Sequence, residues 1–190
     1  MRNRTENQIT IALIRHGATA SNREHRYLGK TDEALDEAGK EELLRLKSEG
    51  KYLKADLLFV SPMKRCKETA ALIYPGMPYI EIPLWEEMDF GEFERKNYKE
   101  LSGDARYQAW IDSNGTLPFP GGESREQFIE RCVQGFYQMK ELSEANDSQP
   151  VTIGCVVHGG TIMALLSHFL GGEYFDYQIS NGGVYLWVSP

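Results

Sequence analysis

Three short apolar runs in this chain are each followed by a turn and a helical pattern, and this alternation constrains the fold more than any other feature. The runs cover residues 9–14, 56–60 and 151–157, and each has the length of one buried strand. Strands that alternate with helices form a largely parallel sheet. The sequence therefore predicts an α/β fold of three layers, in which a mostly parallel central sheet has helices on both faces.

The segments between the apolar runs carry start signals for helices and two further extended stretches. A helix is expected over residues 36–53, and a second is expected to begin at Ser61, with this serine as N-cap and the next residue, a proline, in the first turn. A third begins at Ser124, which forms a capping box with the glutamine three residues later. Extended runs at 79–82 and 183–188 complete the predicted sheet, the second of them at its edge.

The length and charge of the chain limit its organisation and its partners. A chain of 190 residues has the length of one domain, so we predict a single domain over residues 1–190. The net charge is −7, whereas proteins that bind nucleic acid or anionic membranes are usually basic. Neither nucleic acid nor a membrane is therefore an expected partner, and the predicted assembly is a monomer or a homodimer.

The first apolar run and the cysteines predict a cytoplasmic location. The run at 9–14 is too short for the apolar core of a signal peptide or for a membrane span. The three cysteines contain no CxxC pair, and free thiols suit a reducing compartment. No His, Asp and Glu cluster has the spacing of metal ligands, so neither a metal nor a cofactor is expected.

Polar residues follow three of the predicted strands directly. Arg15 and His16 follow the first strand, Ser61 to Arg65 follow the second, and His158 follows the long apolar run near the end of the chain. In α/β folds, ligands bind at the carboxyl ends of the parallel strands. We therefore expect these residues to gather at one edge of the sheet, where two of the four histidines would meet.

The residues around the two histidines suit a phosphate dianion. Gly17 and Gly159 each follow a histidine, and a glycine lets backbone N–H groups approach a ligand closely. Arg15 and Arg65 can each hold two phosphate oxygens in a planar fork. The segment that follows Gly17 adds three residues with neutral hydrogen-bond donors: Thr19, Ser21 and Asn22.

Six motifs, in order along the chain, resemble those of the histidine phosphatase superfamily, in the branch that includes phosphoglycerate mutases and alpha-ribazole phosphatases. They are RHGATASN from residue 15, YLGKTD from residue 27, SPMKRCKETA from residue 61, EMDFG from residue 87, PGGES from residue 120 and VHGG from residue 157. The resemblance runs from residue 9 to about residue 170. It implies a phosphoglycerate mutase-like fold.

The resemblance also implies a role for individual residues. His16 matches the nucleophile that attacks phosphorus, and Glu87 matches the acid that protonates the leaving oxygen. Arg15, Arg65 and His158 match the residues that hold the oxygens of the transferring phosphoryl group. The two arginine charges are expected to keep His16 neutral, and a bound dianion is expected to raise the pKa of Glu87. Further substrate contacts are expected from Asn22, Thr19, Gly29, Thr31 and Gly159.

Several positions leave alternatives open. Glu86 is the adjacent candidate for the acid, although the spacing to the Asp-Phe-Gly of its motif favours Glu87. Arg95 stands where the family usually has glycine, and either it or Lys96 could contact a second anionic group of the substrate or be a solvated surface residue. Four aromatic residues could form the wall of a pocket for a ring-bearing substrate or belong to the core: Tyr27, Tyr98, Tyr107 and Trp110.

The function implied by the resemblance is a metal-independent phosphomonoesterase that acts on a small phosphorylated metabolite through a phosphohistidine. The EMDFG and PGGES motifs resemble those of alpha-ribazole phosphatases, which makes alpha-ribazole 5′-phosphate a candidate substrate. Two alternatives stay open. One is phosphoglycerate mutase-type phosphoryl transfer, for which the stretch between Glu87 and His158 looks short, and the other is a non-catalytic sensor of a phosphorylated ligand.

Overall fold

The computed structural model describes residues 9–145 and 152–189, and within these ranges five strands form one sheet in the order β3-β2-β4-β1-β5. Neighbouring strands pair in parallel from β3 to β1, whereas β5 pairs antiparallel with β1 at the edge. The mostly parallel α/β sheet predicted from the sequence is confirmed. The strands are β1 (Ile9–Arg15), β2 (Leu57–Val60), β3 (Ile80–Glu81), β4 (Thr152–Val157) and β5 (Val184–Ser189).

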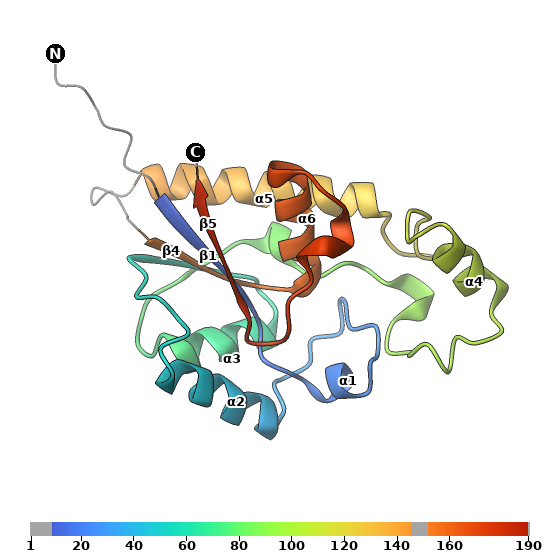
Figure 1. The fold of residues 1–190 in the computed structure, drawn as a ribbon, viewed down its shortest axis with the longest axis horizontal. Helices are drawn as coiled ribbons and strands as arrows, with labels where there is room; N and C mark the ends of the chain where they lie inside the picture. Colours follow the sequence, from blue (N-terminus) through green and yellow to red (C-terminus); the bar gives the residue numbers. More distant parts are fainter. Residues whose placement is uncertain (1–8, 146–151, 190) are drawn as a thin grey trace, which may run out of the picture.

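Helices cover both faces of this sheet, which gives the three predicted layers (Figure 1). One face carries α5 (Arg125–Glu144) and α6 (Gly159–Leu170), and the other carries α2 (Glu37–Ser48) and α3 (Lys64–Ile73). The short helix α4 (Ala105–Asp112) lies away from the sheet, at the end of the molecule beyond the N-terminus of α5. The smaller elements are α1 (Ala20–Arg23), η1 (Pro83–Trp85), η2 (Gly91–Phe93) and η3 (Tyr174–Tyr177).

The alternation of side chains along β1 shows how the two helical layers are held. Ile11 and Leu13 pack into the core under α5 and α6, whereas Ala12 and Ile14 pack into the core under α2 and α3. Successive residues of a strand point to opposite faces, so a central strand that is apolar throughout can bury both faces at once. This double burial fixes β1 and therefore the position of the residues that follow it.

The structure tests several of the predicted boundaries. The helix predicted over 36–53 begins as expected after its N-cap Asp36 but ends at Ser48, before Gly50, whose φ of 74° no helix can include. The first residue of the strand predicted over 151–157 lies outside the described residues. The capping box at Ser124 is confirmed, and the single domain over residues 1–190 stays a prediction.

The helix predicted to begin at Ser61 starts later, and this prediction was wrong. Helix α3 begins at Lys64 after its N-cap Met63, and the amide of Lys64 donates to the carboxylate of Asp32 at 2.6 Å. The Ser61 hydroxyl lies 2.7 Å from Nε2 of His158, a residue of the neighbouring strand end, and also accepts from the amide of Met63 at 3.4 Å. Contacts with distant segments therefore accompany the start of this helix. Among the helices of residues 9–145 and 152–189, none is long and apolar enough to cross a lipid bilayer.

Candidate active site

The ends of three strands bring two imidazole rings together. His16 directly follows β1 and His158 directly follows β4, and the two strands are paired in parallel so that both residues emerge at the same edge. Their ring centroids are 5.2 Å apart, with the planes inclined by 67°. Both side chains are buried. The structure thus brings the two predicted histidines to one place.

A hydrogen bond to the backbone determines which nitrogen of His16 carries its proton. Nδ1 of His16 lies 2.7 Å from the carbonyl oxygen of Gly17, and because a carbonyl only accepts, Nδ1 is the donor. A neutral ring then keeps its lone pair on Nε2. Burial, followed by the charges of Arg65 and Arg15, holds the pKa of His16 well below its ordinary value of 6.5. The free nitrogen is therefore available as a nucleophile.

His158 is held between a serine and an arginine. Nε of Arg65 donates to Nδ1 of His158 at 3.3 Å, and this places the proton of the neutral ring on Nε2, which donates to the Ser61 hydroxyl. Burial and the charge of Arg65 keep the pKa of His158 well below its ordinary value too. Ser61 was expected at this edge of the sheet, but its hydrogen bond with His158 was not predicted.

Arg65 is completely buried beneath the two rings, and its guanidinium also holds a loop. Nη2 donates to the carbonyl of Gly29 at 2.9 Å, and Nη1 donates to that of Thr31 at 3.0 Å. The amides of both loop residues donate to the carboxylate of Glu94. Gly29 and Thr31, predicted as substrate contacts, thus use their backbone groups to position Arg65, and the other hydrogen of each Nη stays available.

Arg15 supplies a second cation with an unused donor. Its Nη1 donates to the carbonyl of Ile179 at 2.6 Å, whereas its Nε is buried and has no hydrogen-bond partner among the described residues. A Cβ on Gly159 would lie 3.2 Å from this Nε, so glycine leaves room beside the guanidinium. Gly159 also opens α6, where the first N–H groups of a helix have no partner within it. An anion bound here would satisfy these donors.

Thr19 and Asn22 serve first as caps of the short helix α1. The Thr19 hydroxyl accepts from the amide of Asn22, and the side-chain oxygen of Asn22 accepts from the amide of Thr19. Thr19 is fully buried, and a contact of either residue with a substrate stays a prediction. Asn181, which sequence reasoning missed, donates to the carbonyl of His16 at 3.1 Å and to Asn22.

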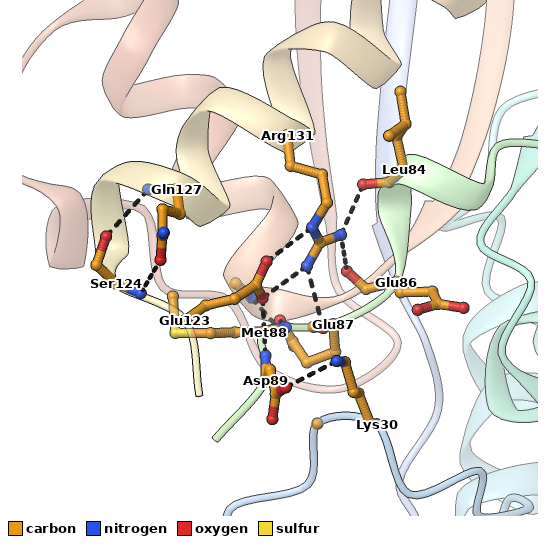
Figure 2. A network of polar contacts seen from close by, with 12 residues as sticks. Lys30, Leu84, Glu86, Glu87, Met88, Asp89, Glu123, Ser124, Gln127 and Arg131 are labelled. Atoms are coloured by element: carbon orange, nitrogen blue, oxygen red, sulfur yellow. Dashed lines mark hydrogen bonds and ion pairs between the residues drawn. The ribbon is translucent and has the colours of Figure 1, made fainter. Parts of the chain in front are cut away.

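Glu87, and not Glu86, lies against the start of α6 and in the field of Arg65 and Arg15. The carboxylate of Glu87 is buried and accepts from its neighbour Met88 at 2.9 Å and from the amide of Gly160 at 3.4 Å. Burial raises its pKa above the ordinary value. The Glu86 side chain extends away from Arg131 and Glu123 (Figure 2). A Cβ on Gly160 would lie only 2.3 Å from a Glu87 oxygen, which explains the second glycine after His158.

A pocket of about 170 Å³ opens next to Glu87 and is mainly aromatic. Of the four aromatic residues left open between pocket and core, Tyr27 and Trp110 line this pocket. Tyr107 is not in the lining, and its hydroxyl lies 3.2 Å from that of Tyr27, whereas Tyr98 is exposed. The residues that line the pocket are Tyr27, Glu87, Met88, Phe90, Trp110, Gly115, Phe119, Arg125, Gly160, Met163, Tyr174 and Phe175.

The cation of this pocket is Arg125, and neither Arg95 nor Lys96 lines it. Arg95 and Lys96 are both exposed. Arg95 has a φ of 63°, in the left-handed region that favours glycine, which gives a physical reason for the glycine that the family usually has there. The guanidinium of Arg125 lies over the rings of Tyr174 and Phe175, at 5.1 and 5.2 Å from their centroids.

Comparison with known proteins assigns this arrangement to a family. The family model of the histidine phosphatase superfamily (branch 1) matches residues 11–187. The chain belongs to this superfamily. It is 31% identical over 168 residues to the phosphatase PhoE of Bacillus subtilis, covering 86% of this chain and 78% of that relative. It is 30% identical over 168 residues to the adenosylcobalamin/alpha-ribazole phosphatase of Escherichia coli, covering 86% and 80%.

A solved structure supports the phosphoglycerate mutase-like fold. The alpha-ribazole phosphatase of Shigella flexneri superposes with a TM-score of 0.78 over 95% of each chain at 24% identity, a level at which the likeness concerns the fold alone. The named relatives of this histidine phosphatase are phosphatases and phosphoglycerate mutases, so the chain is an enzyme that acts on phosphorylated substrates. Within residues 9–145 and 152–189, no group of three or more His, Cys, Asp or Glu could hold a metal ion.

Acid is expected to destabilise the phosphate-free enzyme below pH 6.5. His16 and His158 stay neutral in the fold, whereas the unfolded chain takes up their protons near pH 6.5, so stability is present above this pH and is lost as the pH falls. For each pH unit, each histidine lowers the free energy of unfolding by at most about 1.4 kcal/mol. The raised pKa of Glu87 has the opposite effect on stability, but it comes from one carboxyl group and the loss comes from two histidines. Urea unfolding in phosphate-free buffer between pH 5.5 and 7.0 measures the slope.

The variant His16→Asn provides the control for this experiment, because its side-chain amide can still donate to the Gly17 carbonyl but does not titrate. We expect a smaller slope of the unfolding free energy against pH in this variant than in the unchanged protein. Equal slopes would show that the depressed pKa of His16 is not the source of the acid sensitivity.

Proposed function

We propose that this histidine phosphatase is a metal-independent phosphomonoesterase in which His16 is phosphorylated during each turnover. The observation that carries the proposal is the state of His16: its Nδ1 is bound to the Gly17 carbonyl, which leaves Nε2 unprotonated, and its ring lies next to that of His158 and in the field of Arg65 and Arg15. A nucleophile next to cations is what transfer of a dianionic phosphoryl group requires.

The proposed reaction has two steps with one intermediate. Nε2 of His16 attacks phosphorus while the bond to the leaving oxygen breaks, and Glu87 donates its proton to that oxygen. Arg15 and Arg65 stabilise the charge on the three remaining oxygens, and His158 adds to this by turning its Nε2–H from the Ser61 hydroxyl to one of them. A water molecule then attacks phosphorus, Glu87 takes the proton of the water, and the P–N bond breaks to release inorganic phosphate.

The raised pKa of Glu87 suits both steps. A carboxyl group with an ordinary pKa of 4.5 would be almost entirely ionised at neutral pH and could not donate a proton. Burial against Phe128 and Gly160 raises this pKa, and a bound dianion would raise it further. Glu87 also lines the aromatic pocket, so the leaving group of a bound substrate would extend from the phosphate past Glu87 into that pocket.

The lining of the pocket supports a substrate whose alcohol carries an aromatic or other apolar ring. Tyr27, Phe90, Trp110 and Phe119 form a cluster of rings with centroids 4.9 to 6.1 Å apart, and such surfaces bind ring systems by burial and edge contacts. The volume of about 170 Å³ is below the range of drug-sized ligands, so it fits one ring system. Alpha-ribazole 5′-phosphate, named in the relatives, is the specific candidate.

A matched pair of substrates tests this function. Alpha-ribazole 5′-phosphate and ribose 5-phosphate share the phosphorylated sugar and differ in the ring system, so we expect kcat/KM to be about 10- to 100-fold higher for the first, as burial of a ring implies. The variant Trp110→Leu should reduce this ratio, because it removes a ring of the pocket wall while leaving the residues around the phosphate unchanged.

Three outcomes would contradict the proposal in different ways. Equal kcat/KM for the two substrates would reject the preference for a ring while leaving the phosphatase activity in place. Interconversion of 2- and 3-phosphoglycerate that depends on 2,3-bisphosphoglycerate, without net release of phosphate, would show a mutase. If the protein binds phosphate but hydrolyses no compound, p-nitrophenyl phosphate included, it is a non-catalytic sensor of a phosphorylated ligand.

A further inference from the structure

We propose that Arg131, together with Glu123, is a positioning residue that fixes the carboxyl group of Glu87. The inference rests on the proposed function, because it takes Glu87 to be the acid and base of the reaction. Neither residue lines the aromatic pocket, so both would act through Glu87 and not on the substrate. The sequence motifs assign no role to Arg131.

The backbone around Glu87 lacks regular structure and needs other support. Residues 86–90 belong to no helix or strand, since the turn η1 ends at Trp85. In a helix or a sheet, ladders of backbone hydrogen bonds would set the direction of each side chain. Here the segment follows a short turn, so side chains from elsewhere must determine where the Glu87 carboxyl group points.

One guanidinium group contacts this segment from behind. Nη1 of Arg131 donates to the carbonyls of Leu84 at 2.8 Å and Glu86 at 3.0 Å, and Nη2 lies 3.4 Å from the carbonyl of Glu87 (Figure 2). The guanidinium is planar and rigid, so three carbonyls bound to it are fixed relative to one another. Its own position is set by α5 and by the Phe128 ring, whose centroid lies 5.1 Å away.

Glu123 extends the same support to the other side of Glu87. Its carboxylate forms a bidentate pair with Arg131, from Nε at 2.9 Å and from Nη2 at 2.8 Å. The same carboxylate accepts from the amide of Asp89 at 2.8 Å, and the Glu123 amide donates to the carbonyl of Asp89 at 3.0 Å. The pair therefore holds the backbone both before and after Glu87, and Figure 2 shows it on the side of the segment that faces α5.

The position of the Glu87 carboxyl group leaves little tolerance. Glu87 Oε1 lies where a Cβ on Gly160 would be only 2.3 Å away, so the carboxylate is packed against the first turn of α6. Catalytic groups must be held within about 0.5 Å of the productive geometry. The guanidinium of Arg131 supplies that precision, because it is carried by the 20-residue helix α5 and is bound to three carbonyls and to the carboxylate of Glu123.

The test separates proton donation from general damage by varying the leaving group. p-Nitrophenolate leaves without protonation, whereas the alkoxide of ribose 5-phosphate needs a proton from the acid. We expect Arg131→Met to lower kcat/KM for ribose 5-phosphate about 10- to 100-fold and kcat/KM for p-nitrophenyl phosphate less than about threefold. The ratio kcat/KM reports the step that expels the leaving group, whereas kcat also contains the hydrolysis of the phosphohistidine, in which Glu87 acts alike for both substrates. In the Glu87→Gln background the same substitution should cause no additional loss, because residues that act as a unit are not additive.

Three further variants complete the experiment. Arg131→Lys should restore part of the lost activity, since an ammonium donates to carbonyls but not as a fork. Glu123→Gln keeps the volume of the side chain and an acceptor for Asp89, and should show the same dependence on the leaving group if Arg131→Met fails to fold. Arg106→Met removes an exposed arginine with two ion pairs, to Glu92 and Asp104, and should leave kcat/KM unchanged for both substrates.

The outcomes distinguish this inference from the proposed function. Equal losses on the two substrates in Arg131→Met, or an additional loss in the Glu87→Gln background, would overturn the positioning role. If Glu87→Gln itself leaves the hydrolysis of ribose 5-phosphate unchanged, the assignment of Glu87 as the acid fails, and the inference fails with it.

Discussion

Replacement of His16 by alanine is expected to lower kcat by about 10⁴-fold or more, the largest loss of any substitution in this enzyme. The reason is that Nε2 of His16 is the atom that would form the bond to phosphorus, and no other side chain of the site offers an unprotonated nitrogen in its place. Both nitrogens of His158 are engaged, with Arg65 and with Ser61. Steady-state hydrolysis of p-nitrophenyl phosphate measures the loss.

A rapid quench into alkali measures the intermediate directly. With substrate carrying radiolabelled phosphate, the unchanged enzyme should retain label that is lost on acid treatment, and His16→Ala should retain none. His168→Ala is the matched control, because this exposed histidine of α6 lies against Phe169 and away from the site. Undiminished turnover in His16→Ala, or retained label, would show that another group attacks phosphorus.

The parts of the fold that could be predicted from the sequence are those determined by nearby residues. The apolar runs that became β1 and β4 bury both faces of a strand, which makes their pattern unambiguous. The capping box at Ser124 lies within one turn and was found as predicted. The start at Ser61 was wrong because its hydroxyl binds His158, a residue 97 positions away along the chain, and no local signal records such a contact.

The same distinction holds for the candidate site. The two histidines could be placed together because strand ends of a parallel sheet meet at one edge. The residues that orient this centre could not be placed, because Asn181 reaches His16 from the connection before β5, and Arg131 reaches Glu87 from the middle of α5. Gly160 is visible in the sequence as the second glycine after His158, but the reason for a glycine there is the contact with Glu87, which only the structure shows.

Replacement of Arg65 by methionine is expected to lower kcat/KM by about 10³-fold and to move the acid limb of the pH profile to higher pH. Arg65 supplies a buried cation to the transferring phosphoryl group, which explains the first effect. Its charge also lowers the pKa of His16 and of His158, so without it both rings become protonated at a higher pH, and protonated His16 cannot attack phosphorus. The pH dependence of kcat/KM for p-nitrophenyl phosphate measures both effects.

Two variants separate the charge of Arg65 from its geometry. Arg65→Lys keeps the charge but cannot donate to Gly29, Thr31 and His158 in one plane, so its acid limb should stay in place while kcat/KM recovers only in part. Arg45→Met removes an exposed arginine of α2 and should change neither quantity. If activity falls in Arg65→Met while the acid limb stays where it was, burial alone keeps the imidazoles neutral, and Arg65 acts only on the phosphoryl oxygens and on the loop that it holds.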